Sequence, residues 1–410
     1  MGAEQPGVAA VIARLPDPER GLAAYGSVVF PIALVIEAPV IMLLAASTEL
    51  SRDRVAYRAL TRFSHRVGAI MTLLHALVAL TPLGDWVIAS VLSVPHDIAV
   101  AARPGMVLML PWVWSIAWRR TGQGLLIRGG RSHLVGVGTF VRLVASSTVL
   151  ASGYLHGGFS GVVVGASALS VGVMAEAIFV AILVRGVVRE LPEGDPDQPP
   201  LRGRSFAAFY VPLALTPIVM LLIQPVGTAA IARMPHVVSS LAVWPVLAGL
   251  MLVFQSVGLA FNEVVVALLQ RPGMRGALRR FAIVLTIAVT SIWALLGFTP
   301  LAQLWFEGAI GLPSDLASMA MIGVAIALPV PASRVAQSWI QGLLIAARRT
   351  RVITEAVIVF AVTCVGSLVV GVTWQGPAGF YVMIGGFTAG RVLQTAWLYW
   401  RARTVIAESR

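Results

Sequence analysis

The chain is a succession of long apolar stretches separated by short polar connections. A helix of about 20 predominantly apolar residues crosses the hydrocarbon core of a bilayer, and each stretch reaches that length. The pattern therefore predicts an all-α integral membrane protein with about eleven full spans. The predicted spans are 22–46, 67–91, 104–125, 134–155, 162–185, 206–233, 239–268, 280–304, 315–346, 352–373 and 377–400.

A second pattern is an internal repeat in which one constant offset relates two halves of the chain. The sequence QGLLI occurs at 123–127 and again at 341–345, and TPL occurs at 81–83 and again at 299–301. The same offset pairs Arg185 with Arg403 without a gap. The chain therefore contains two copies of one unit. In an apolar chain of this size, such repeats are typical of transporters with a site between the halves.

The first copy begins late in its own first helix. Residues 5–14 (QPGVAAVIAR) match residues 224–233 (QPVGTAAIAR) at six of ten positions, and the latter form the second half of a span. We therefore expect two six-helix bundles with the first helix of the N-terminal bundle truncated, related by a pseudo-twofold axis along the membrane normal. The predicted domains are an N-terminal bundle at 1–186, a polar, proline-rich cytoplasmic linker at 187–204 and a C-terminal bundle at 205–410.

Composition agrees with a membrane protein, since 58% of residues are hydrophobic and 12% are charged. A net charge of +12 invites a nucleic-acid partner, but the arginines gather in alternate connections. That arrangement is the positive-inside rule, so we expect no nucleic acid and a multi-pass protein of the cell (inner) membrane with a cytoplasmic C-terminus. The arginine clusters are 52–66, 119–131, 185–204, 271–280, 348–351 and 401–410.

Two residue counts exclude whole classes of chemistry. The sequence contains no lysine, so it has neither a Walker A loop nor a Schiff-base lysine. A transporter built in this way runs on an ion gradient or on a separate subunit. The single cysteine, Cys364, excludes an intrachain disulfide and a thiolate metal cage, and we interpret it as a core residue.

Six stretches of the sequence carry a resemblance to known proteins. They are AAYG at 23–26, HALVALTPLGDWVI at 75–88, GLLIRGGRSHLVG at 124–136, YVPLAL at 210–215, LPVPAS at 328–333 and QGLLIAARRT at 341–350. These stretches resemble the multidrug/oligosaccharidyl-lipid/polysaccharide exporter superfamily, which includes the multidrug and toxin extrusion (MATE) transporters, and within it the chain is most similar to the progressive ankylosis family. That resemblance implies an exporter of organic anions such as citrate, nucleotides or pyrophosphate. One departure is Gln224, which stands before Pro225 where the family has an arginine.

Two carboxylates stand in the middle of predicted spans of the first copy. A charge at the bilayer centre costs about 2.5–3.5 kcal/mol on insertion scales, so each of these carboxylates must have a functional or a structural role. The repeat pairs Glu37 with Gln255 and Glu176 with Gln394, so the second copy carries the isosteric amide in both cases. Ion coupling at Glu37 or Glu176 is one interpretation, and a structural hydrogen-bonded carboxylate is the other. Glu263, late in its span, is a third coupling candidate.

Arginines and amides in the spans are the candidate anion ligands. Arg334 follows the Pro329 and Pro331 break and shares its helix with Gln337 and Gln341. A guanidinium there suits bidentate binding of a carboxylate or phosphate, although it could instead pair with Glu37 or Glu176. Arg142 could bind substrate or snorkel to the cytoplasmic surface. The full candidate set is Arg142, Arg334, Gln337, Gln341, Arg391, Gln394, Gln224, Gln255 and Asn262.

His75 stands mid-span and is a candidate proton relay, although a packed histidine is the more common case. A membrane enzyme acting through His75 or His156 is disfavoured, because no acid–base constellation or long extramembrane loop is present. We predict a non-enzymatic secondary transporter that exports a small organic anion by rocking of two lobes around a central cavity. The partners are an anionic substrate, a proton or sodium ion and membrane lipid, with no cofactor and no metal site, in a monomer. A MATE-like drug or cation antiporter, and a flippase for a lipid-linked substrate, are the alternatives.

Overall fold

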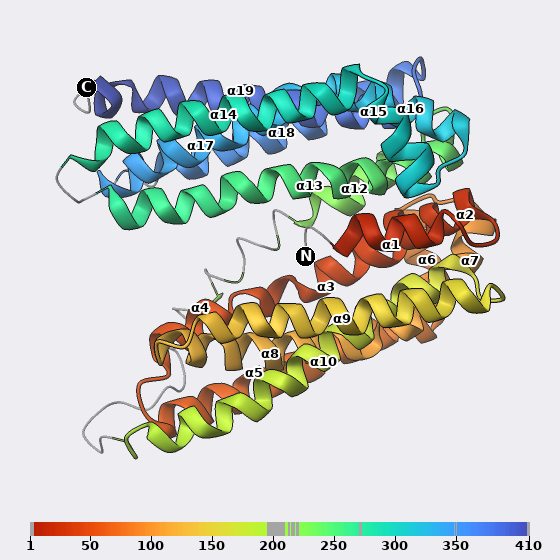
Figure 1. Ribbon diagram of the computed structural model, residues 1–410. Coiled ribbons are helices and arrows are strands. Elements are labelled where there is room, and N and C mark those ends of the chain that lie inside the picture. Colours follow the sequence, from red (N-terminus) through yellow and green to blue (C-terminus); the bar gives the residue numbers. More distant parts are fainter. Residues whose placement is uncertain are drawn as a thin grey trace. The chain divides into compact units, whose positions relative to one another are not determined.

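The structure is a computed structural model that describes residues 4–194, 210, 211, 214, 218, 221–269, 273–347, 349 and 351–407. The regular structure in these residues is all helical, as predicted (Figure 1). The chain divides into two units, each with its own core. We call Leu15–Pro225 the N unit, and Met1–Arg14 together with Val226–Arg410 the C unit.

The N unit has a long or bent helix at each predicted span between residues 22 and 185. The residues at which these helices begin and end differ from those predicted from hydropathy. Its elements are α2 (Pro18–Leu22), the π-helical segment η1 (Ala23–Val29), α3 (Phe30–Ile41), α4 (Leu43–Leu50), α5 (Arg54–Leu80), α6 (Pro82–Trp86), the π-helical segment η2 (Val87–Val91), α7 (His96–Leu108), α8 (Leu110–Arg128), α9 (His133–His156) and α10 (Gly161–Glu190). α2 to α4 form one 33-residue candidate span.

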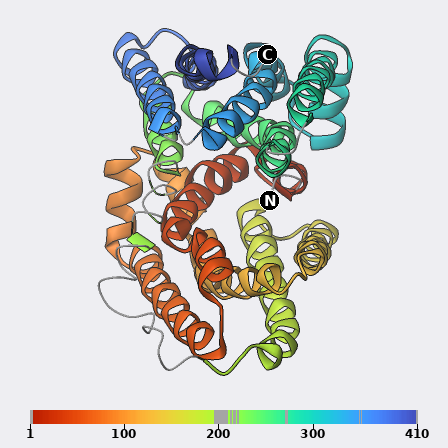
Figure 2. The ribbon, with the colours of Figure 1, turned by 90° about the vertical axis from the view of Figure 1, so that its left-hand side faces the viewer.

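The C unit repeats this order, and Figure 2 views its long helices close to end-on. Its elements are α1 (Glu4–Ile12), α13 (Val237–Leu268), α14 (Met274–Phe298), α15 (Leu301–Gln303), the π-helical segment η3 (Leu304–Ile310), α16 (Ser314–Ile326), α17 (Pro329–Ala346), α18 (Arg351–Trp374) and α19 (Gly379–Ala407). α12 (Ile223–Ile231) crosses the boundary between the two units.

The internal repeat is confirmed at the level of single residues. The offset that carries position 123 onto 341 also carries both ends of α7 onto those of α16, and both ends of α9 onto those of α18. Irregular backbone recurs too, because Gly157 and Gln375 at equivalent helix ends both adopt positive φ, 67° and 54°. Thr81 and Thr299 each cap the next helix through a hydroxyl that accepts from the N–H two residues on, at 3.3 Å. The two copies of the repeat therefore share the same backbone structure although their sequences differ.

A proline breaks the same span in each copy. α7 and α8 meet at 43° and α16 and α17 at 41°, each with a proline within the first two residues of the second helix. Proline lacks the N–H that would continue the hydrogen-bond ladder, so a bend at this place is expected. Within the described residues, seven helices are long and apolar enough to cross a membrane, and nine if each bent pair counts as one span.

Two predicted spans were wrong by about a turn or more. The span predicted at 67–91 is α5, which begins at Arg54 and ends at Leu80 before the Thr81–Pro82 turn. The span predicted at 280–304 is α14, which ends at Phe298 for the same reason. The arginine-rich first turns of both helices lowered local hydropathy and hid their starts. Of the predicted span 206–233, residues 221–233 are described and contain α12, whereas most of 206–220 lies outside the described residues.

Residues 4–14 pack with the C unit, although the predicted boundary joined them to the first bundle. Arg14 holds them there, since its guanidinium donates to the carbonyls of Gly308, Ala309 and Ile310 at 2.6–2.8 Å. These carbonyls end η3 and have no intrahelical partner, so a cation there is favourable. Of the predicted linker, 187–190 continue α10 and 195–204 lie outside the described residues. The other domain limits stay predictions.

Candidate functional site

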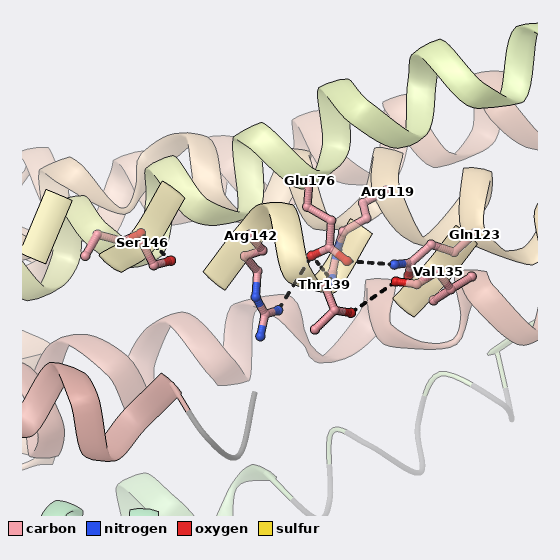
Figure 3. Close-up of polar contacts among 8 residues, drawn as sticks. Arg119, Gln123, Val135, Thr139, Arg142, Ser146 and Glu176 are labelled. Atoms are coloured by element: carbon pink, nitrogen blue, oxygen red, sulfur yellow. Dashed lines mark hydrogen bonds and ion pairs between the residues drawn. The ribbon is translucent and has the colours of Figure 1, made fainter. Parts of the chain in front are cut away.

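A buried ionic network joins three helices of the N unit (Figure 3). The Glu176 carboxylate on α10 accepts from Arg119 Nη1 at 2.6 Å and from Gln123 Nε2 at 2.9 Å, both on α8. Arg142 on α9 lies 3.7 Å from the same carboxylate. Arg119, Arg142 and Glu176 are 4%, 2% and 0% exposed. At this burial an unpaired charge is very costly, so the contacts with the two arginines stabilise the Glu176 carboxylate.

Close approach of α9 and α10 brings Arg142 to Glu176. At Gly172 an added Cβ would lie 2.0 Å from Ser146 Oγ and 3.1 Å from the Arg142 carbonyl, so only glycine lets the two helices meet. Ser146 donates to the Ala168 carbonyl at 3.1 Å. In the C unit the equivalent Cys364 donates to Gly386 at 3.5 Å. The cysteine is therefore a helix-packing residue, which agrees with its interpretation as core.

Glu37 is a second buried carboxylate of the N unit. It lies on α3 at 1% exposure, and its Oε2 has no hydrogen-bond partner among the described residues. The charges that act on it are those of Arg119, Arg120 and Arg142. The N unit thus combines two carboxylates with three guanidinium groups in one electrostatic cluster.

The equivalent positions of the C unit are neutral. Gln337 replaces Arg119 and Gln394 replaces Glu176, and the Gln337 amide donates to Gln394 Oε1 at 3.2 Å and to Thr395 Oγ1 at 2.9 Å. An amide–amide contact therefore takes the place of the ion pair between the same two helices, here α17 and α19. Both glutamines are buried.

Two arginines inside spans of the C unit, Arg334 and Arg391, have no carboxylate partner among the described residues. Arg391 on α19 donates to Gln394 Oε1 at 3.1 Å, and its guanidinium lies over the rings of Phe360 and Phe387 at 4.4 and 5.0 Å. Arg334 on α17 is close enough for its charge to act on Arg391. Neither arginine forms an ion pair within the described parts of the chain, and both are partly exposed. Glu37 and Glu176 belong to the N unit, so the alternative that Arg334 pairs with one of them stays a prediction.

The remaining candidates are placed as follows. Asn262 on α13 donates to the Ser338 carbonyl at 3.2 Å and so ties α13 to α17. Gly258, one turn earlier, meets Arg334 so closely that an added Cβ would lie 2.7 Å from its Cγ. Gln224, Gln255 and Gln341 are partly exposed, and Glu263 is exposed. None of these four side chains has a hydrogen bond to another described residue.

His75 occupies the position of Trp293 in the repeat. Trp293 Nε1 donates to the Val324 carbonyl at 2.9 Å, at the end of α16. His75 is fully buried beside the equivalent Met106, although neither ring nitrogen completes a well-formed hydrogen bond within the described residues. The comparison favours a packing role over a proton relay.

Two expectations about arginines were wrong. Arg119 and Arg120 were assigned to a cytoplasmic connection, but they lie in the middle of α8, and Arg119 is the closest partner of Glu176. Arg142 does not snorkel, because it is buried and directed at Glu176. The internal repeat could have identified these residues. Arg119 aligns with Gln337 and Gln123 aligns with Gln341, and both glutamines are among the predicted substrate ligands.

Metal binding has no support in the described residues, since they contain no group of three or more His, Cys, Asp or Glu side chains that could hold an ion. The Glu176 network of the N unit and the Arg334–Arg391 pair of the C unit provide hydrogen-bond donors and positive charge inside membrane-spanning helices. Such groups are suited to carboxylate or phosphate oxygens.

Comparison with known proteins finds no matching family model and no curated protein with a matching sequence. Solved structures do match. An inward-facing multidrug resistance MATE family transporter of the MOP superfamily aligns with a TM-score of 0.75 at 13% identity, over 100% of this chain and 96% of the other. The lipid II flippase MurJ, in an inward closed conformation, aligns with a TM-score of 0.72 at 12% identity, over 98% and 85%.

A third match is a MOP superfamily transporter from Pyrococcus furiosus, described as having a binding pocket of reverse polarity, with a TM-score of 0.59 at 14% identity over 99% and 95% of the chains. The protein is therefore an all-helical membrane protein with the fold of the MOP superfamily transporters. The finer likeness to the progressive ankylosis family rests on the sequence stretches alone.

Proposed function

We propose that the protein is a secondary transporter for small organic anions and that Arg334 and Arg391 bind the substrate. One observation carries the proposal: two guanidinium groups of the C unit lie within range of each other's charge, inside membrane-spanning helices, with no carboxylate paired to either in the described chain. Intramembrane cations normally pair, and a pair of like charges gains most from an anion that bridges them.

The surroundings of Arg391 support a binding role. Stacking on Phe360 and Phe387 holds the guanidinium plane, and its contact with the neutral Gln394 leaves its charge uncompensated. Its Nε has no partner among the described residues. A drug cation would be repelled by the same two arginines, so the cation antiporter is the weaker alternative.

A lipid-linked substrate is the second candidate, because the fold is shared with a lipid II flippase. A lipid-linked diphosphate also presents anionic oxygens, so the arginine pair is compatible with either substrate. Flux of water-soluble anions distinguishes them.

For the coupling ion we propose a proton at Glu37. The carboxylate is buried with one oxygen unpartnered, and three arginines act on it. A proton changes the charge balance of the cluster by binding to one carboxylate oxygen, whereas a sodium ion would need several oxygen ligands around it. Rocking of the two halves would then expose the substrate alternately to each side of the membrane.

The experiment loads proteoliposomes with radiolabelled citrate or ATP and imposes a pH or a sodium gradient. We expect wild-type flux driven by the pH gradient, and at least a 30-fold loss in Arg334→Gln. The matched control is Arg279→Gln, an exposed arginine of α14 in the same unit, which should transport normally. Glu37→Gln should lose gradient-driven flux and retain exchange of labelled for unlabelled anion.

Absence of flux with both anions under both gradients, in protein that is folded by size-exclusion chromatography, would overturn the anion proposal. A positive assay with a lipid-linked diphosphate in the same vesicles would then favour the flippase.

A further inference from the structure

The two units carry the same polar network with the charges rearranged. At the position of the acceptor, the N unit has the carboxylate of Glu176 and the C unit has the amide of Gln394. An arginine lies at each acceptor: Arg142 of α9 is 3.7 Å from Glu176 on α10, and Arg391, on α19 like Gln394, is 3.1 Å from its acceptor.

The positions of these two arginines are exchanged across one helix contact. Arg142 on α9 aligns with Phe360, and Arg391 on α19 aligns with Val173. The α9–α10 and α18–α19 pairs meet at the equivalent glycines, Gly172 and Gly390. A guanidinium therefore reaches the same place in both units, from opposite sides of the contact.

The two units differ in the group that lies opposite the charge of this arginine. In the C unit the arginine meets a neutral amide, and its charge is left for a ligand. In the N unit the carboxylate is part of the chain, and it is fully buried together with Arg119 and Arg142. A tethered group acts at a very high effective concentration, commonly on the order of millimolar or above, and binding to it needs no loss of translational freedom.

We infer that Arg142 forms a second position for anion binding, equivalent to that of Arg391, and that the Glu176 carboxylate is its permanent tethered occupant. Only the C unit is then left open to a free anion, and the protein binds one substrate anion although it contains two copies of the site. The inference rests on the proposed function, because it takes the Arg334–Arg391 pair as the open copy.

A reciprocal exchange of side chains tests it. R119Q/E176Q gives the N unit the amide pair that the C unit already has at these positions, so that Arg142 meets a neutral acceptor. Q394E gives the C unit the carboxylate of the N unit, with Arg391 already within 3.1 Å to pair with it. The Glu/Gln exchanges keep side-chain volume, R119Q shortens its side chain, and both variants imitate an arrangement that this chain already folds.

The probe is radiolabelled citrate in equilibrium binding to the purified full chain in detergent. We expect one site in wild type, two in R119Q/E176Q, and at least a 100-fold loss of citrate affinity in Q394E. Adding R142Q to R119Q/E176Q should return the count to one. Arg279→Gln should match wild type throughout, and melting temperatures report whether each variant is folded.

The outcomes separate the inference from the proposed function. A wild type that binds no citrate overturns the proposed function, and the inference then depends on whether R119Q/E176Q gains a site. Folded R119Q/E176Q with an unchanged count overturns the inference. If that variant does not fold, Q394E decides: unchanged citrate affinity overturns the inference, and lost affinity in a folded protein supports it.

Discussion

The N unit and the C unit solve the same structural problem with opposite electrostatics. Both join the second half of a proline-bent span to the last helix of the bundle through residues at equivalent positions of the repeat. The N unit uses the Arg119–Glu176 ion pair, and the C unit uses the Gln337–Gln394 amide contact. The same helix contact thus accommodates either a charged pair or a neutral pair.

The comparison also shows which arginines have a carboxylate nearby and which do not. The N unit contains carboxylates for its arginines, whereas in the C unit Arg334 and Arg391 have none among the described residues. A duplicated unit can therefore keep one backbone while one copy becomes a rigid ionic core and the other becomes a binding surface. Four predictions test the comparison of the two units, in order of decreasing expected effect.

Arg119→Gln alone should destabilise the protein most, by about 3–5 kcal/mol, because it leaves the buried Glu176 carboxylate with Arg142 at 3.7 Å as its nearest cation. The equivalent change in the C unit, Gln337→Ala, removes a neutral hydrogen bond and should cost about 1–3 kcal/mol. Denaturant unfolding in detergent compares them. Equal losses would show that the ionic and amide contacts are energetically alike.

Gly124→Ala should be worse than Gly342→Ala. An added Cβ at Gly124 would lie 2.6 Å from the Leu44 carbonyl oxygen and 2.8 Å from the Thr48 backbone nitrogen, so α4 and α8 must separate. At Gly342 the nearest atom is Val265 Cγ1 at 2.2 Å, which belongs to a side chain. Overpacking costs about 1–3 kcal/mol, with the larger value expected at Gly124. Melting temperatures of the two variants provide the measurement, and the reverse order would contradict this packing.

Trp293→Phe should lose about 1 kcal/mol, because it removes the indole hydrogen bond to the Val324 carbonyl. His75 fills the same place in the N unit, so His75→Gln should affect stability to a similar degree and leave the pH dependence of transport unchanged. A shifted pH profile in folded His75→Gln would restore the proton-relay interpretation.

Cys364→Ser should have the smallest effect on stability, because the equivalent Ser146 already makes the same bond to the carbonyl of the neighbouring helix. The new hydroxyl keeps that hydrogen bond, so the change should stay below the roughly 1 kcal/mol that a typical hydrogen bond contributes. Thermal unfolding measures this directly. The variant would contain no cysteine and would serve as a background for site-directed labelling. A marked loss of stability would mean that the two helix contacts differ more than their geometry shows.

Much of the architecture follows from the sequence. Apolar stretches gave the helical membrane fold, and the constant offset of the repeat gave two copies whose helix ends agree to the residue in α7 and α16. Hydropathy averages over a window, so it missed the starts of α5 and α14, where arginines face outward in the first turns. It also misplaced Arg119, since a single arginine inside a span has the same effect on a window as one at its end.

The sequence by itself determined which residues are equivalent, because equivalence depends only on the alignment of the two copies. Glu176 with Gln394 was found in this way. Only the tertiary structure decided which charges are satisfied, because an ion pair depends on distances between helices that are far apart along the chain. Arg119 and Glu176 are separated by 57 residues and meet at 2.6 Å, whereas Arg334 and Arg391, on α17 and α19, meet no carboxylate in the described chain.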